Sequence, residues 1–177
     1  FKKLSDSLKK VSTQFCVLSD NDDFFNPACL KKSVEFLQNN NDYSTCGGQS
    51  IQFSKTINNK LTSFNFFKDA YQKSNEINDS LLRLEDICKN MTSVPLFYDI
   101  HRTSEISESY KLLDEMKINE LLLVEIFPQF YDAMNGKNMK LEELYLIRYI
   151  QINESANREY VKKNGDFLER LIFTNFS

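Results

Sequence analysis

The stretch TQFCVLSDNDDFFNPACL, residues 13–30, decides the fold class that the sequence predicts. Its first part, residues 13–19, is a short apolar run with aromatic and β-branched side chains, which is typical of a buried strand. The polar turn of residues 20–23 ends that run, and Pro27 then stands where the first turn of a helix would begin. Apolar side chains at helical spacing continue this helix over residues 27–38. A buried strand that leads through a polar turn into a helix favours an α/β fold.

The rest of the chain repeats this alternation of strands and helices. Apolar residues at helical spacing predict further helices over residues 2–10, 78–90, 103–116, 119–134 and 155–173. Extended apolar runs predict strands over residues 43–53, 61–67 and 95–102, of which 61–67 pairs back as a hairpin strand. Residues 141–150 fit either a helix or a strand. The alternation predicts a single domain, residues 1–177, with helices on both faces of a sheet.

The predicted strand of residues 43–53 contains the pair Gly47 and Gly48. Glycine contributes no side chain to the packing of a sheet. A glycine pair inside a strand therefore usually marks a bulge, or a place where a ligand or another strand approaches the backbone closely. We expect one of these features at this pair.

Length, composition and charge exclude several classes of protein. The 177 residues suit one domain, and only 4 glycines and 3 prolines argue against collagen-like and linker-like chains. The net charge of −3 argues against a nucleic acid as the partner. No run approaches the roughly 18 apolar residues of a transmembrane helix. The four cysteines and the single histidine lack the spacing of a zinc site, so we expect buried free thiols in a reducing cytoplasm.

The polar turn of residues 20–23 carries the strongest functional signal. It contains three carboxylates, those of Asp20, Asp22 and Asp23, which repel one another unless a cation joins them. Carboxylate oxygens suit a divalent metal, and ligands of open α/β sheets collect at the carboxyl ends of strands. An EF-hand loop is excluded, because Phe25 stands where its invariant glycine belongs. A phosphoaspartate nucleophile loop and a purely structural acidic turn remain as alternatives.

The acidic turn and the residues after it resemble a known family. The turn, together with Pro27 and Leu30, is similar to the D-x-D-D-x-x-x-P-x-x-L segment of family 2-type glycosyltransferases, which have the GT-A fold. The similarity extends over most of the chain and is strongest to a bacterial subfamily of these enzymes. Its further motifs are the glycine pair of residues 47–48, the Y-x-x-H-R strand of residues 98–102, the G-K of residues 136–137 and the L-x-R of residues 146–148.

The resemblance implies a GT-A-like, mostly parallel sheet with the strand of residues 13–19 at its centre. It also implies an incomplete nucleotide-binding half, because those enzymes hold the base with segments that lie far before the acidic turn. We therefore expect residues upstream of Phe1 to complete the site. The implied activity is metal-assisted, inverting transfer of a sugar from a nucleotide-diphosphate-sugar donor. The acceptor would be a glycan or lipid-linked hydroxyl in surface-polysaccharide assembly, with peripheral membrane association.

The resemblance also assigns roles to single residues. Asp22 would ligate Mg²⁺ or Mn²⁺, and Asp20 would share the metal or face the ribose. Asp23 would bind the donor indirectly or cap the following helix. Arg102 would pair with a donor phosphate, and the neighbouring His101 would lie near the same cleft. For these last two, a structural role is the alternative.

The proton acceptor in such enzymes is a carboxylate that precedes an apolar helix. The best match is Glu120, which stands before Leu121 and carries an asparagine at the preceding position, where the family has an acidic residue. A helix-start residue, placed by the helix dipole, is the alternative for Glu120. Glu125 and then Asp79 are the reserve candidates for the base.

Two other functions compete with sugar transfer. A degenerate transferase fold could act as a glycan- or protein-binding module, a reading favoured by the asparagine before Glu120. A metal-dependent phosphohydrolase could use the same acidic turn, but the sequence offers no companion cluster of histidines or lysines. The donor sugar and the acceptor are not encoded in any motif.

Overall fold

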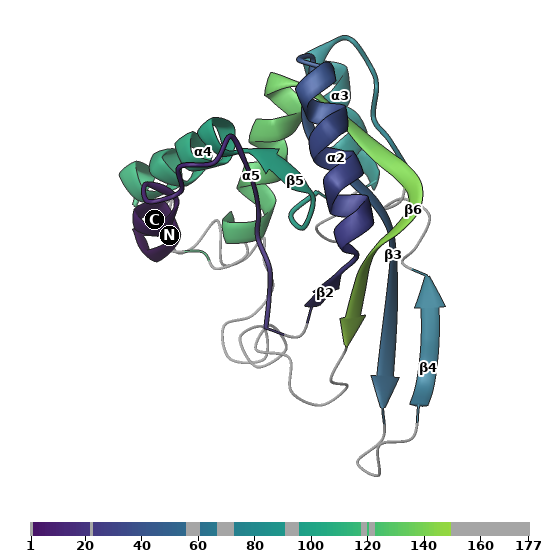
Figure 1. Cartoon of the computed structure of the whole chain (residues 1–177). Coiled ribbons are helices and arrows are strands. Elements are labelled where there is room, and N and C mark those ends of the chain that lie inside the picture. The colour runs from purple at the N-terminus through teal and green to yellow at the C-terminus, as the bar shows by residue number, and fades with distance from the viewer. Residues whose placement is uncertain are drawn as a thin grey trace.

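The computed structural model describes residues 2–21, 23–55, 61–66, 73–90, 96–117, 120 and 123–149, with the backbone alone at residues 55, 61–66 and 90. Its helices are α1 (Lys2–Leu8), α2 (Pro27–Asn39), α3 (Ser80–Asn90), α4 (Thr103–Met116) and α5 (Leu123–Asn135). Its strands are β1 (Phe15–Val17), β2 (Asp23–Phe25), β3 (Tyr43–Lys55), β4 (Leu61–Phe66), β5 (Ile100–Arg102) and β6 (Lys137–Tyr149). The chain is thus an α/β protein, as the sequence predicted (Figure 1).

Most of the predicted elements are present within a few residues of their expected bounds. The ambiguous stretch of residues 141–150 lies mainly in strand β6, which begins earlier, at Lys137. The predicted strand of residues 95–102 is much shorter, because only Ile100–Arg102 pair as β5. The predicted helix over residues 155–173 lies outside the described residues.

The sheet is mixed, and the prediction of a mostly parallel sheet is not confirmed. The strand order is β1-β5-β3-β6-β2, with β4 also paired to β3. Among the described strands only the β3–β6 pairing is parallel. The prediction that the first strand is central is wrong, because β1 lies at one edge and pairs only with β5.

The pairing of β1 accounts for its edge position, because this 3-residue strand pairs with β5 alone among the described strands. The centre belongs instead to β3, which has 13 residues and pairs with three other strands. The hairpin of β3 and β4 confirms the predicted antiparallel return.

Helices pack on the long strands of this sheet. Helix α2 lies over β3 and β6, and α5 contacts the same two strands (Figure 1). Helices α3 and α4 pack on α5, and α1 packs on α4.

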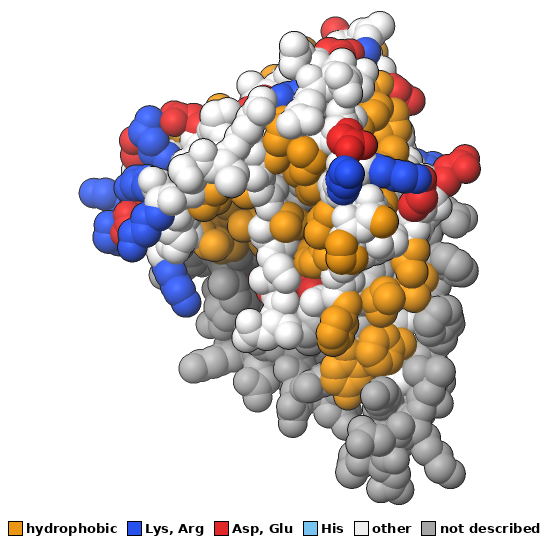
Figure 2. Space-filling view, in the orientation of Figure 1, with side chains coloured by type: hydrophobic (Ala, Val, Ile, Leu, Met, Phe, Trp, Pro, Cys, Tyr) orange, Lys and Arg blue, Asp and Glu red, His pale blue; other side chains and the backbone are white. Residues whose placement is uncertain are grey.

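Asn26 caps α2, because its side-chain oxygen accepts the N–H of Ala28, and Pro27 occupies the first turn as predicted. In Figure 2, charged side chains gather at the end formed by α1 and α4 and again at α2, and hydrophobic ones lie beside α2 and below it, near β2.

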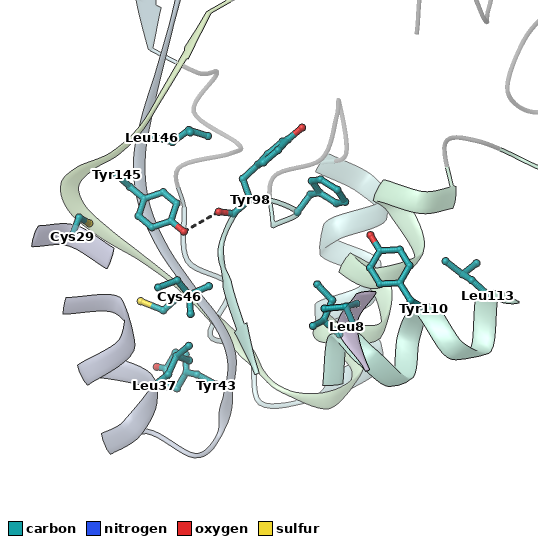
Figure 3. Close-up of a cluster of buried hydrophobic side chains, with 13 residues drawn as sticks. Leu8, Cys29, Leu37, Tyr43, Cys46, Tyr98, Tyr110, Leu113, Tyr145 and Leu146 are labelled. Atoms are coloured by element: carbon teal, nitrogen blue, oxygen red, sulfur yellow. Dashed lines mark hydrogen bonds between the residues drawn. The ribbon is translucent and has the colours of Figure 1, made fainter. Parts of the chain in front are cut away.

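The core joins the α2 face of the sheet to the helices around α4. Figure 3 shows Leu37, Cys46 and Tyr145 beneath α2, and Tyr110 with Leu113 on α4. The buried hydroxyl of Tyr145 donates to the carbonyl of Tyr98 at 2.8 Å, so its polar end is satisfied.

All four cysteines are free thiols. Cys29 and Cys46 are buried as expected, Cys16 is partly buried, and Cys88 is exposed, contrary to the prediction for that residue.

The glycine pair marks both a bulge and a close approach, as the sequence predicted. The register of β3 against β6 shifts between Gly47 and Gln49. A Cβ atom at Gly47 would lie 1.9 Å from Oδ1 of Asp99, and one at Gly48 would lie 2.6 Å from the backbone oxygen of Glu143. Because alternate residues of a strand face opposite sides of the sheet, the two glycines admit neighbours on both faces.

Replacing Gly48 by alanine is expected to lower the free energy of unfolding by about 1–3 kcal/mol, the usual cost of overpacking. The neighbour that the new methyl group would meet is the backbone of Glu143, which cannot rotate away. Urea denaturation of Gly48→Ala beside Gln52→Ala, a truncation in the same strand, measures the effect. Wild-type stability of Gly48→Ala would contradict the close approach.

Candidate functional site

The acidic turn follows β1 and continues into β2, and its described carboxylates are held by one arginine. Nε and Nη2 of Arg148 donate to the two carboxylate oxygens of Asp23 at 2.7 and 2.8 Å. Nη2 also donates to Oδ2 of Asp20 at 3.0 Å. The antiparallel pairing of β2 with β6 places Asp23 directly opposite Arg148, so the sheet register builds this contact. A guanidinium group matches the planar geometry of a carboxylate in this two-pronged arrangement.

Tyr98 completes the arrangement around Asp20. Its hydroxyl donates to Oδ2 of Asp20 at 2.8 Å. The guanidinium carbon of Arg148 lies 3.8 Å from the centre of the Tyr98 ring, within the range of a cation–π contact. The backbone N–H of Asp20 donates to Oδ2 of Asp23 at 3.1 Å and closes the turn. The turn is therefore fixed by both side-chain and backbone contacts.

The carboxylates of the acidic turn predict a neighbouring positive charge, and Arg148 supplies it. Asp22, the main predicted metal ligand, lies outside the described residues. No group of three or more histidine, cysteine, aspartate or glutamate side chains in the described part of the chain could hold a metal ion. Asp20 nevertheless has a 57% exposed side chain, and none of the contacts above uses its Oδ1. An exposed carboxylate oxygen of this kind fits Mg²⁺ or Mn²⁺.

The three candidate bases lie in different surroundings. Glu120 is only 2% exposed and precedes α5, and its backbone oxygen accepts the N–H of Leu123. Glu125, in the first turn of α5, is partly buried. Burial raises the pKa of Glu125, the Asp20 carboxylate raises it further, and Arg148 opposes the rise. Glu125 therefore lies within electrostatic reach of the acidic turn. Asp79 caps α3, where its Oδ1 accepts the N–H groups of Leu81 and Leu82.

His101 is fully buried and joins β5 to α5. Its Nδ1 lies 2.9 Å from Oδ2 of Asp132, and its Nε2 lies 3.1 Å from the carbonyl oxygen of Phe97. A carboxylate and a carbonyl oxygen both accept hydrogen bonds, so these surroundings favour a proton on each ring nitrogen. Burial lowers the pKa of His101, but the Asp132 carboxylate and the Phe97 carbonyl outweigh it, so the pKa lies above its ordinary value of 6.5. These contacts give His101 a structural role.

Arg102 is also engaged by the protein itself. Its guanidinium donates to the carbonyl oxygens of Tyr43, Leu37 and Asn40 at 2.8–2.9 Å. These contacts tie β5 to the end of α2 and the start of β3. The arrangement corresponds to the structural alternative for Arg102 rather than to a guanidinium that faces a phosphate.

A second buried ion pair was not predicted from the sequence. Lys140 on β6 donates to Oδ1 of Asp99 at 2.5 Å, and both side chains are almost fully buried. Asp99 also fills the space left open by Gly47. Burial raises the pKa of Asp99 and the Lys140 ammonium opposes the rise. The one sequence signal for this contact was the glycine pair, which predicted a close neighbour but did not identify that neighbour as Asp99.

Comparison with protein families and with curated proteins finds no match to this chain. In the described part of the chain, no helix is both long and apolar enough to cross a membrane.

Proposed function

We propose that the protein is a glycosyltransferase that uses a nucleotide-diphosphate-sugar donor. The observation that carries the proposal is the acidic turn after β1, where Arg148 and Tyr98 hold the carboxylates of Asp20 and Asp23 in a fixed arrangement. The Asp20 side chain is 57% exposed, so its carboxylate is accessible to a ligand. The resemblance of this turn to the glycosyltransferase segment supplies the chemistry.

In this proposal Asp20 and Asp22 would hold Mg²⁺ or Mn²⁺. Such a metal would supply positive charge for the leaving diphosphate. Asp23 is engaged on both oxygens by Arg148, so it shapes the turn instead of contacting the donor.

The reaction needs a group that takes the proton of the acceptor hydroxyl. The hydroxyl oxygen forms a bond to the anomeric carbon, while the bond from that carbon to the diphosphate oxygen breaks. The diphosphate leaves with the electron pair, and the hydroxyl proton passes to a carboxylate. We assign this base to Glu120, and Glu125 is the reserve because it lies within electrostatic reach of Asp20.

Binding of Mn²⁺ together with a nucleoside diphosphate tests the donor site. Calorimetric titration of the full-length protein with uridine, guanosine, cytidine and adenosine diphosphates, each with Mn²⁺, is expected to show binding of at least one. Asp22→Ala should lose that binding without unfolding the domain, because a turn carboxylate contributes little to the core. Asn21→Ala, a neighbouring change in the same turn, should retain it.

Equal nucleotide affinity of the wild type and Asp22→Ala would contradict the assignment of Asp22. Binding of a glycan in the absence of any nucleotide binding would favour the non-catalytic module in place of the enzyme.

A further inference from the structure

We propose that Tyr110 is a positioning residue that fixes the first turn of α5, next to which the candidate bases of the reaction lie. This inference rests on the proposed function, because Glu125 belongs to that turn and Glu120 stands just before it. Tyr110 lies on α4, which packs on α5, and its side chain is fully buried. No motif in the sequence assigns a role to Tyr110.

Pro128 leaves one carbonyl group of α5 without its helical partner. In an α-helix the carbonyl of one residue accepts the N–H of the residue four positions later, and proline has no N–H. The backbone oxygen of Val124, four residues before Pro128, therefore needs another donor. The hydroxyl of Tyr110 donates to this oxygen at 2.7 Å. The Tyr110 hydroxyl thus replaces the hydrogen bond that Pro128 cannot make.

Gln129 holds the same turn of α5 from a second side. Its side chain is fully buried, and its Nε2 donates to the backbone oxygen of Glu125 at 2.8 Å. Its Oε1 accepts the N–H of Leu96 at 3.0 Å. Leu96 stands two residues before Tyr98, whose hydroxyl donates to Asp20. The first turn of α5 is therefore fixed toward α4 by one buried side chain and toward the segment that contacts the acidic turn by another.

The position of this turn sets where both candidate bases lie. The N–H of Leu123, the first residue of α5, donates to the backbone oxygen of Glu120 at 3.2 Å, so Glu120 is attached to the turn. Glu125 lies within the turn and interacts electrostatically with Asp20. Moving a catalytic group by about 1 Å lowers a rate by up to about 10²-fold. Loss of the Tyr110 hydroxyl would therefore weaken catalysis although Tyr110 itself does not contact the substrate.

Tyr110→Phe tests the inference, because it removes the hydroxyl and keeps the ring in the core. Amide hydrogen exchange in the first two turns of α5, followed by nuclear magnetic resonance, is expected to become about 10–100-fold faster, since a carbonyl has lost its donor. The last turn of α5 should keep its wild-type exchange rates. In transfer assays kcat should fall by about 10–100-fold. The KM for the donor should stay unchanged, because the base acts on the acceptor.

Pro128→Ala is the rescuing change, because it supplies the missing backbone N–H at position 128. In this background Tyr110→Phe should no longer speed exchange or lower kcat, since the carbonyl of Val124 has a helical donor again. Ser109→Ala is the matched control. Ser109 is equally buried on α4, and its hydroxyl donates to the backbone oxygen of Ile106 in the same helix. This control should leave both the exchange rates of α5 and kcat unchanged.

Three results would overturn the positioning role of Tyr110. These are wild-type exchange rates in Tyr110→Phe, faster exchange with an unchanged kcat, and an equal loss of kcat with and without Pro128→Ala. If the wild type transfers sugar from no donor, the proposed function fails instead. The exchange rates of the single and double variants then decide by themselves whether Tyr110 fixes the first turn of α5.

Discussion

Glu120→Gln is expected to lower sugar transfer by about 10²–10⁴-fold, the usual contribution of a general base. Glutamine keeps the shape of the side chain and removes its ability to accept the hydroxyl proton. Donor binding should survive, because the base acts on the acceptor. Glu120 is 2% exposed and stands three residues before the first residue of α5. Release of nucleoside diphosphate in the presence and absence of acceptor measures the effect.

Glu125→Gln is the matched comparison for that result. Glu125 lies in the first turn of the same helix, but it interacts electrostatically with Asp20 of the acidic turn and with Arg148. If Glu120→Gln retains near-normal transfer and Glu125→Gln loses it, the base is Glu125, and Glu120 is only a residue at the start of the helix. Calorimetry with the donor nucleotide shows whether either variant has lost binding instead of chemistry.

Breaking the buried His101–Asp132 pair is expected to lower the free energy of unfolding by about 3–5 kcal/mol, because the remaining partner stays in the interior without its counter-charge. Both side chains are at most 1% exposed. Guanidinium denaturation of His101→Ala and Asp132→Ala measures the loss. Asp6→Ala, which removes an exposed ion pair with Lys2 and Lys9, should leave the denaturation midpoint nearly unchanged.

The pH dependence of stability follows from the raised pKa of His101. A group whose pKa is higher in the folded state stabilises the protein fully below its unfolded pKa, near 6.5, and loses that contribution as the pH rises through the folded value. Wild type should therefore lose stability as the pH rises above 6.5, and His101→Ala should lose less. Parallel curves for the two proteins would show that His101 is not held as an imidazolium.

Local patterns predicted the elements well, and the order of the strands poorly. Pro27 and the apolar spacing after it placed α2 correctly, since the preference of proline for the first turn and the helical periodicity are local properties. The position of β1 at an edge depends on its pairing with β5, about 85 residues away. No pattern within residues 13–30 carries that information. The stretch of residues 141–150 was ambiguous because its apolar side chains fit both the helical and the strand periodicity. Pairing with β3 makes the residues up to 149 a strand.

The candidate site could be predicted only in part for the same reason. The charges of Asp20, Asp22 and Asp23 indicated a neighbouring cation, and a pattern of carboxylates alone points to a metal ion before it points to an arginine. Arg148 was visible as part of a motif, yet its contact with Asp23 follows from sheet register across 125 residues. The Y-x-x-H-R strand pointed to His101 and Arg102, whose side chains have structural partners. The residue of that motif that reaches the turn is Tyr98.

The central claim is that the acidic turn binds the diphosphate of a nucleotide sugar. Phosphorus-31 nuclear magnetic resonance of the full-length protein with Mg²⁺ and a panel of nucleotide sugars tests it directly, since slow transfer to water needs no known acceptor. The account predicts that at least one donor is converted to its nucleoside diphosphate and that Asp22→Ala abolishes the conversion. Conversion of no donor in the panel, together with no binding of any nucleoside diphosphate, would contradict it.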